Sequence, residues 1–260
     1  VFSQGLSAVL CYIYMRRKFE ILQSSPKERR FQPKLAKTLL YIGVPMGLQF
    51  SITAIGSIML QSANNALGTA CVAAFTSAMR IKMFFICTFE SLGIAMATYS
   101  GQNYGAGKAG RVREGLRKCA LACEAITLGI MVIMTAFGGV MSSWFIDGYH
   151  PEVIQQAHLY LFISALFYPA LTMLFLYRNT LLGLGNGVTP MLAGVCELLS
   201  RMIGAPVLGH FFGFTGLCWI NPIAWVTASG LLFLSYRKTM RNIRPVDPTV
   251  DASDSNKIMN

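Results

Sequence analysis

Five charged residues inside long apolar stretches are the side chains of this sequence best placed to do chemistry. Arg80, Lys82 and Glu90 occur in one stretch, and Glu197 and Arg201 occur in another. Glu197 and Arg201 are four residues apart, so a helix brings them to one face, where they can form an ion pair. Ionisable groups inside membrane-spanning helices are costly and usually mark substrate or ion pathways. The pair has two open interpretations, a lock between helices and a role in ion or substrate passage.

The remaining charged residues of the apolar stretches have interpretations of their own. Arg80 lies near the middle of its stretch, which favours a place on a water-filled cavity. Lys82 and Glu124 are expected to extend toward the membrane surface, as long charged side chains often do. For Glu90 a cavity and a partner helix both stay open.

Uncharged polar residues form a ladder along the stretch 39–61 and just beyond its end. The ladder consists of Gln49, Thr53, Gln61, Asn64 and Asn65. Such groups can join helices through hydrogen bonds, or they can line a cavity for substrates that form hydrogen bonds. Methionine and phenylalanine are plentiful nearby, Met46 among them, and such surfaces adapt to varied ligands and attract cations. Helix packing alone also explains each of these residues.

Recognisable catalytic and metal-binding patterns are missing from the sequence. The three histidines share no metal-ligand spacing with acids, and the seven cysteines form no CxxC pair. There is no GxSxG motif, and GAGKAG lacks the GK[ST] ending of a phosphate-binding loop. The sequence therefore predicts no enzyme, no catalytic residue, no cofactor and no metal site.

The composition indicates a membrane protein. Apolar residues make up 54% of the chain and charged residues only 13%, whereas a soluble domain carries about a quarter charged residues. The apolar residues arrive in runs of about 20, the length that crosses a bilayer as a helix. Six spans are predicted, at 39–61, 71–98, 120–140, 153–177 (broken by Pro169), 188–209 and 217–236.

The segment Ser100–Lys118 is Gly-rich and basic, and it separates two predicted spans. Such a chain cannot lie in hydrocarbon, where its backbone and charges would be unsatisfied, and basic connections usually face the cytoplasm. Of the 22 Lys and Arg residues, only Arg80, Lys82 and Arg201 fall inside spans. The net charge of +11 therefore follows the positive-inside pattern and does not indicate a nucleic-acid-binding protein. Both ends of the six-span unit are predicted to be cytoplasmic.

Four regions follow from this pattern. Residues 1–15 are predicted to be the end of a preceding transmembrane helix, and 16–38 a cytoplasmic linker between two halves of a transporter or an ordinary long loop. Residues 39–236 are predicted to be a six-helix lobe, and 237–260 a disordered cytoplasmic tail. Because Val1 lies within an apolar stretch, we expect an N-terminal part to be absent from this chain.

Several sequence blocks resemble the multidrug and toxic compound extrusion (MATE) transporters. The blocks are GVPMGLQ at Gly43–Gln49, NNALGTACVAAFTSAMRI at Asn64–Ile81, GIAMATYSGQNYGAGKAGRVREG at Gly93–Gly115, RNTLLGLGNGVTP at Arg178–Pro190 and ELLSRMIGAP at Glu197–Pro206. The resemblance extends to about Tyr236, and its most specific part is GQNYGAGK. It implies an all-α protein with twelve helices in two six-helix lobes, of which this chain would hold helices seven to twelve.

The resemblance also implies export of organic, often cationic compounds in exchange for Na⁺ or H⁺. Some members carry a cation-binding Glu in helix seven and an Asp just after helix ten; the matching positions here hold Thr53 and Asn186. Neither side chain can carry a proton or a negative charge, so coupling is expected to depend on the absent N-terminal lobe. Glu197 or Glu90 is the alternative within this chain.

The leading hypothesis is a multi-pass lobe in the cytoplasmic membrane that expels amphipathic or cationic small molecules by Na⁺- or H⁺-coupled antiport. Its expected substrate-binding residues are Met46, Gln49, Thr53, Asn65 and Arg80, and its expected coupling or pathway residues are Glu90, Asn186, Glu197 and Arg201. The nearest alternative is a flippase of the same superfamily that moves a lipid-linked precursor, which Arg80, Lys82 and Arg201 would favour. A membrane-embedded enzyme or a receptor is a more distant alternative.

Overall fold

The computed structural model describes residues 2–19, 31–146, 148 and 150–242, and every regular element in them is an α-helix. The helices are α1 (Phe2–Lys18), α2 (Pro33–Asn65), α3 (Thr69–Gly105), α4 (Ala109–Ser143), α5 (Pro151–Leu166), α6 (Tyr168–Gly183) and α7 (Val188–Asn242). The chain divides into two compact units, Val1–Tyr41 and Ile42–Asn260. The first contains α1, which buries no residue. The second contains the helices that concern function.

Helix α7 is two antiparallel helices joined at Gly213. Its 55 residues would extend roughly 80 Å if straight, more than twice the thickness of a hydrocarbon core. Gly213 has φ 56° and ψ −135°, a backbone conformation that glycine adopts readily. Hydrogen bonds then join the two arms along their length, from Ser235 to Thr189 (3.1 Å) and from Arg201 to Asn221 (3.3 Å). The predicted spans 188–209 and 217–236 are the two arms.

Helices α5 and α6 form one bent span. Their axes differ by 53° at a break of a single residue, Phe167. Pro169 stands in the first turn of α6, where its missing N–H costs no hydrogen bond although it could not continue α5. The predicted break at Pro169 is therefore confirmed. With α2, α3, α4 and the two arms of α7, the described residues contain the six helical segments that the sequence predicted as spans.

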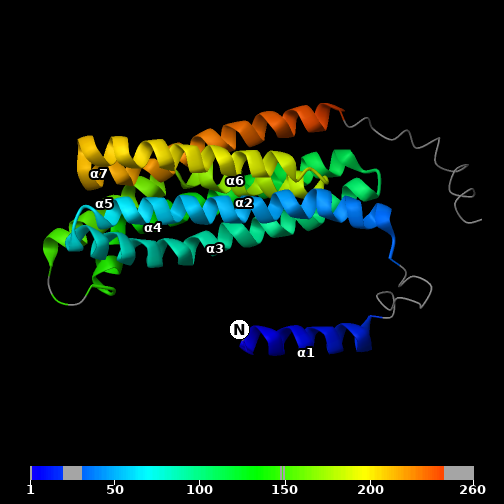
Figure 1. Cartoon of the computed structure of the whole chain (residues 1–260), viewed down its shortest axis with the longest axis horizontal. Helices are drawn as coiled ribbons and strands as arrows, with labels where there is room; N and C mark the ends of the chain where they lie inside the picture. Colours follow the sequence, from blue (N-terminus) through cyan, green and yellow to red (C-terminus); the bar gives the residue numbers. More distant parts are fainter. Residues whose placement is uncertain (1, 20–30, 147, 149, 243–260) are drawn as a thin grey trace, which may run out of the picture. The chain divides into compact units, whose positions relative to one another are not determined.

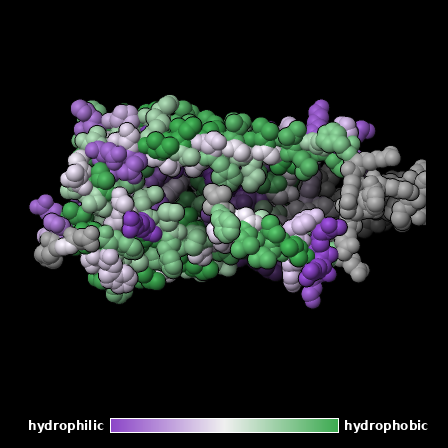
Figure 2. Space-filling view, turned by 60° about the horizontal axis from the view of Figure 1, so that its bottom comes forward, coloured by the Kyte–Doolittle hydropathy of each residue, from purple (hydrophilic) through white to green (hydrophobic). Residues whose placement is uncertain are grey.

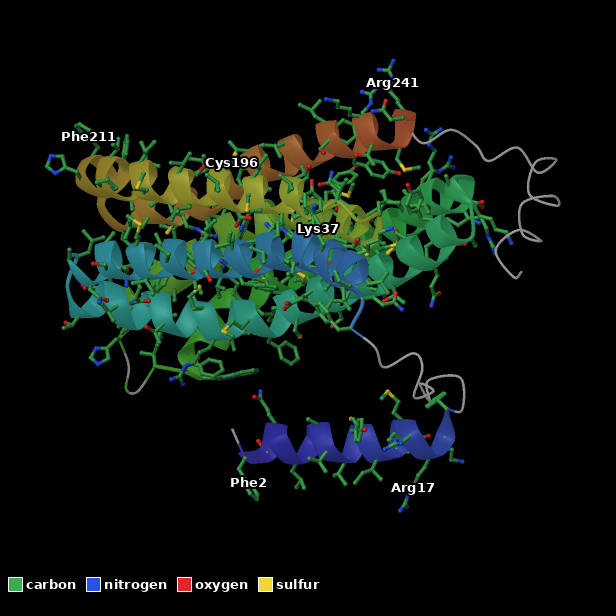
Figure 3. The ribbon with its side chains drawn as sticks, turned by 45° about the vertical axis from the view of Figure 1, so that its right-hand side comes forward. Phe2, Arg17, Lys37, Cys196, Phe211 and Arg241 are labelled. Carbon is green, nitrogen blue, oxygen red and sulfur yellow. The ribbon has the colours of Figure 1, made fainter. Side chains whose placement is uncertain are left out.

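The connections alternate between the two ends of the second unit (Figure 1). The α3–α4 and α6–α7 connections and the end of α7 lie at one end, and the α2–α3, α4–α5 and Gly213 connections lie at the other. Phe211 and Arg241 mark these opposite ends in Figure 3. In Figure 2 hydrophobic residues cover much of the middle of the visible face, and hydrophilic residues gather toward both ends. This distribution suits a bilayer with water on both sides.

The helices extend beyond several of the predicted boundaries, because they continue past the apolar residues. The predicted loop Ser100–Lys118 shrinks to three residues, 106–108, since α3 ends at Gly105 and α4 begins at Ala109. Helix α1 ends at Lys18 rather than at 15, and α2 begins at Pro33, inside the predicted linker. Helix α7 continues to Asn242, so 237–242 belong to a helix and not to a tail. The rest of the predicted linker (20–30) and tail (243–260) lies outside the described residues.

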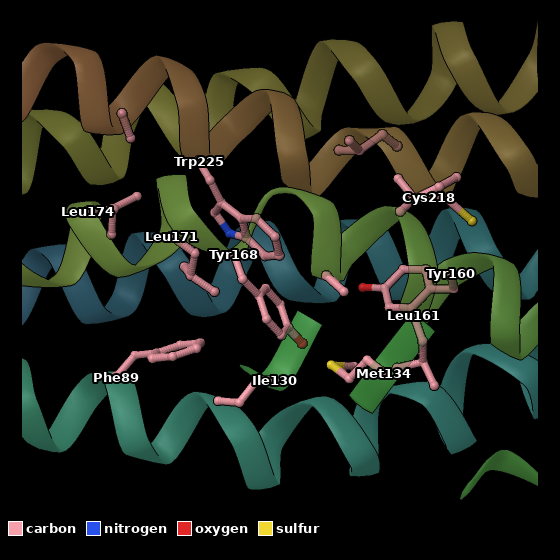
Figure 4. Close-up of a cluster of buried hydrophobic side chains, with 14 of the residues drawn as sticks. Phe89, Ile130, Met134, Tyr160, Leu161, Tyr168, Leu171, Leu174, Cys218 and Trp225 are labelled. Carbon is pink, nitrogen blue, oxygen red and sulfur yellow. The ribbon is translucent and has the colours of Figure 1, made fainter. Parts of the chain in front are cut away.

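The core of the second unit gathers large side chains from α3, α4, α5, α6 and α7 (Figure 4). Phe89 and Tyr168 meet edge to face, with ring centroids 5.6 Å apart, and Tyr168 also contacts the ring of Trp225 at 6.1 Å. Such aromatic pairs add directional contacts to the burial of apolar area. Tyr160 belongs to this core too, and its hydroxyl leads to the candidate site.

Candidate functional site

An ion-paired carboxylate lies inside the lobe. Glu197 is only 3% exposed, and its Oε2 accepts a hydrogen bond from Nη2 of Arg201 at 3.3 Å. The predicted pairing of Glu197 with Arg201 is confirmed. Its other oxygen, Oε1, accepts from Nη2 of Arg178, a residue of α6. Both carboxylate oxygens are therefore held by arginines, one from each of two helices.

Arg178 corrects a prediction. The predicted spans 153–177 and 188–209 leave Arg178 in the connection between them, but it lies within α6 and is 8% exposed. The connection begins only at 184, because Leu181 and Leu182 add one more apolar turn to α6 after Arg178. The resumption of apolar residues after Arg178 was the available signal. A cation with apolar residues on both sides lies inside a helix, where it needs a partner group on a neighbouring helix.

A chain of hydrogen bonds extends from this ion pair through the lobe. Nε of Arg201 donates to Oδ1 of Asn221 (3.3 Å), and Nδ2 of Asn221 donates to the Tyr160 hydroxyl (2.9 Å). That hydroxyl also accepts from Nζ of Lys82 at 3.2 Å. We call the six residues Lys82, Tyr160, Arg178, Glu197, Arg201 and Asn221 the buried network. It joins α3, α5, α6 and both arms of α7.

Lys82 also corrects a prediction. Instead of extending toward the membrane surface it is 4% exposed, with Nζ 4.6 Å from the centroid of the Trp225 ring and 5.5 Å from that of Tyr160. It lies on the face of α3 that also buries Ala78 and Phe89, so the helix directs it into the core. Aromatic faces attract a cation, and here they take the place of a carboxylate.

The buried network has more positive groups than negative ones. Lys82, Arg178 and Arg201 are basic, and Glu197 is its single acid. Nε of Arg178 and Nη1 of Arg201 are buried N–H groups without an acceptor in the part of the chain that the structure describes. Buried charges need partners to offset the loss of hydration. The lobe interior is therefore electropositive.

The residues expected to bind substrate on α2 are dispersed. Gln49 is buried, with its side chain against Gly194 of α7, and Thr53 is half-buried with an Oγ1 that has no hydrogen-bond partner among the described residues. Met46 and Asn65 are exposed, and Oδ1 of Asn65 accepts from Gln61 (2.9 Å). The structure does not bring these residues together with Arg80.

The other predicted residues have separate surroundings. Arg80 is exposed and lines a cavity of about 610 Å³ with Ser77 and His150. Glu90 is exposed on α3. Oδ1 of Asn186 accepts a hydrogen bond from the backbone N–H of Thr189 (3.1 Å) at the start of α7, which is the geometry of a helix N-cap. Asn186 therefore has a structural partner already.

A second cavity, of about 670 Å³, lies between α2 and the first arm of α7. Met59, Met202 and His210 line it, with small residues such as Ser62 and Ala205. Its volume is within the range of small-molecule sites. Sequence reasoning missed Met202 and His210, because nothing in the order of residues pairs the end of α2 with that arm of α7.

Taken together, six apolar spans and an internal network of ionisable residues define a multi-pass membrane protein with the features of a transporter lobe. A family model described as MatE matches residues 42–207. The chain belongs to the MatE family.

Curated relatives agree with this assignment. The chain is 25% identical over 235 residues to the probable multidrug resistance protein YpnP of Bacillus subtilis strain 168, covering 90% of this chain and 50% of that protein. It is 23% identical to the probable multidrug resistance protein YoeA of the same strain, covering 91% and 52%. The chain spans about half the length of these relatives.

Solved structures share the fold. An outward-facing multidrug resistance MATE family transporter of the MOP superfamily matches with a TM-score of 0.84 and 18% identity, covering 93% of this chain and 55% of that one. A MOP superfamily transporter of Pyrococcus furiosus, described as having a binding pocket of reversed polarity, matches with a TM-score of 0.71 and 19% identity, covering 85% and 48%. The fold class predicted from the sequence is confirmed.

Proposed function

We propose that this chain is the C-terminal lobe of an antiporter that exports organic, often cationic compounds in exchange for Na⁺ or H⁺. Membership of the MatE family over residues 42–207 carries the proposal, since relatives of this family are named for multidrug resistance. In this function the chain transports its substrates and does not transform them. It works with a second six-helix lobe, and the substrate occupies the space between the two.

The cavity between α2 and α7 supports substrates of this class. Its lining is mostly apolar, with the flexible side chains Met59 and Met202 and the ring of His210. Methionine adapts its shape to varied ligands. Gln49, Thr53 and Asn65 of α2, with Met46, provide hydrogen bonds and contacts when the second lobe is present, and Arg80 lines a separate cavity.

The proposed orientation places the basic end of the lobe in the cytoplasm. That end carries Lys108, Arg111, Arg113, Arg117, Lys118, Arg237, Lys238 and Arg241. Basic residues next to spans favour the cytoplasmic side. The opposite end, with Glu152 and the Gly213 turn, then faces outward, and both ends of the lobe are cytoplasmic.

The electropositive buried network favours a second candidate, a flippase for a lipid-linked precursor. Phosphate groups of such a precursor would be attracted by Lys82, Arg178 and Arg201. The apolar cavity between α2 and α7 favours export of small organic compounds over the flippase function. The two functions differ in the charge of the substrate, so competition separates them.

Ethidium efflux from drug-sensitive bacterial cells tests the proposal. The protein is expressed as it is encoded, with any sequence that precedes Val1, and efflux is followed by fluorescence. We expect faster efflux than in cells with an empty vector. Met202→Ala should slow efflux several-fold at equal membrane abundance, whereas Leu234→Ala, an exposed residue outside the cavity, should not. Inhibition of ethidium efflux by undecaprenyl-linked sugars would favour the flippase instead.

A further inference from the structure

Lys82 is surrounded by groups that cannot neutralise it. From α5 it faces Tyr160, from the second arm of α7 it faces the ring of Trp225, and from the first arm it faces the charge of Arg201. Tyr168 of α6 and Cys218 of α7 lie next to Tyr160. Among the described residues no carboxylate is within ion-pair distance of Lys82.

The network can change its charge at only one residue. Arginine keeps its proton in proteins, so Arg178 and Arg201 stay positive. Glu197 stays ionised because a proton on it would leave two buried arginines without a counter-charge. Lys82 differs, since buried lysines can exist without their proton. With neutral Lys82 the network has a net charge of +1, and with protonated Lys82 it has +2.

The same charges exclude a sodium site in this network. Na⁺ is bound through oxygen ligands, and both oxygens of Glu197 are taken by arginines, whose buried charges repel a further cation. Among the described residues, no group of three His, Cys, Asp or Glu side chains could hold a metal ion. A coupling cation at this place in the lobe therefore has to be a proton.

We propose that Lys82 is the proton-exchanging residue of this lobe and links proton uptake to release of the exported cation. The inference rests on the efflux function proposed above and names its coupling residue. When Lys82 gains a proton, the interior of the lobe gains one positive charge. Like charges repel more strongly in a medium of low dielectric constant, so an organic cation in the cleft is bound less tightly.

Tyr160 gives this exchange two distinct hydrogen-bonding states. With Lys82 protonated, the Tyr160 oxygen accepts from Nζ and from Asn221, and its own O–H donates to Sδ of Met79 (3.6 Å). Release breaks one Nζ–H bond, leaves the electron pair on Nζ, and passes the proton to a water molecule. The Tyr160 O–H can then turn from Met79 to donate to the neutral amine. Uptake reverses these steps.

Fluorescence of Trp225 can follow the charge of Lys82 directly, because the ring and Nζ are in contact. The protein, expressed as it is encoded and purified in detergent, carries Trp144→Phe and Trp219→Phe so that Trp225 is the only tryptophan left of the three in this chain. We expect one single-proton change in emission between about pH 5 and about pH 9. Lys82→Met and Lys82→Arg should abolish it, while Lys118→Met, on a lysine whose side chain is 75% exposed, should keep it.

A titration that persists in Lys82→Met or Lys82→Arg would overturn the proposal, as would a flat profile in the protein with native Lys82. Since arginine preserves the charge and the donor, Lys82→Arg remains informative if Lys82→Met fails to fold.

Ethidium binding provides a second test of the proposal. The affinity for ethidium should fall about tenfold from pH 8 to pH 6 with native Lys82, a typical coupling between two sites, and should not depend on pH in either Lys82 variant. If a sodium gradient drives efflux by the protein with native Lys82 but not by the Lys82→Met variant, the assignment of a proton to Lys82 is wrong. Absence of any ethidium binding would contradict the efflux function, and the Trp225 titration would still decide the role of Lys82.

Discussion

Helices α2 and α7 are equally apolar but are packed very differently. Both contain a stretch apolar enough to cross a membrane, yet 11% of that stretch is buried in α2 and 50% in α7. Helix α2 exposes large residues such as Val44, Phe50 and Ile58, while α7 buries Glu197, Arg201 and Asn221. Hydrophobicity determines that both cross the membrane, and packing determines which one belongs to the interior of the lobe.

This difference separates two kinds of polar residue. On α2, polar side chains such as Gln61 and Asn65 bond to each other on an exposed surface. On α7, Glu197 bonds to α6, Asn221 bonds to α5, and Arg201 joins the two arms of α7. Residues of the first kind are available to a substrate or to a second lobe. Residues of the second kind couple the helices of the lobe to one another.

Removal of the network's acid should have the largest effect. Glu197→Gln leaves Arg178 and Arg201 buried without a counter-charge, which costs about 3–5 kcal/mol of stability. Glu90→Gln is the matched control, because Glu90 is exposed, and it should change stability by less than about 0.5 kcal/mol. Thermal unfolding in detergent and abundance in the membrane measure both variants. Equal stability of the two variants would contradict the importance of the buried network.

Alanine substitutions at two glycines of α2 should change the stability of the protein in opposite directions. A Cβ on Gly56 would lie 3.1 Å from Nη1 and 3.2 Å from Cδ of Arg201, a side chain that Glu197 and Asn221 hold in place. Gly56→Ala should therefore cost about 1–3 kcal/mol through overpacking. A Cβ on Gly47 meets nothing within 4 Å, so Gly47→Ala should stabilise the helix by about 0.5–1 kcal/mol. If the melting temperatures of the two variants in detergent shift equally, α2 does not pack tightly against Arg201.

Two asparagines should give smaller effects than the removal of Glu197. Asn64 of α2 is buried, and neither atom of its amide has a hydrogen-bond partner among the described residues. Asn64→Leu should therefore stabilise the lobe by about 1 kcal/mol. Asn186 caps α7, so Asn186→Ala should cost about 1 kcal/mol. Loss of stability in Asn64→Leu, measured by thermal unfolding, would indicate that the amide has a partner beyond this chain.

The number of spans and the Glu197–Arg201 pair could be predicted from the sequence, because both depend on local patterns. Apolar run length determines a span, and four-residue spacing places Glu197 and Arg201 on one face. The ends of the helices could not be predicted, because helices such as α3 and α4 continue in water without apolar residues. Hydropathy does not detect these extensions.

The partners of Lys82 and Arg178 could not be predicted for another reason. Lys82 and Tyr160 are 78 residues apart, and their contact depends on how α3 packs against α5. The helical periodicity of α3 shows that Lys82 shares a face with Ala78 and Phe89, which was a usable signal. It does not reveal that Trp225 and Tyr160 lie opposite that face.

Ethidium export driven by a pH gradient in proteoliposomes most directly tests whether α2 contacts the substrate while the buried network exchanges the proton. The protein is used as it is encoded, and Thr53→Val of α2 is compared with Lys82→Met of the network. Thr53→Val should raise KM several-fold and leave the pH dependence of export unchanged. Lys82→Met should leave KM at high pH within about threefold of the native value and remove the pH dependence. If Thr53→Val alters the pH dependence while Lys82→Met preserves it, the assignment of substrate contacts to α2 and of proton exchange to the network is wrong.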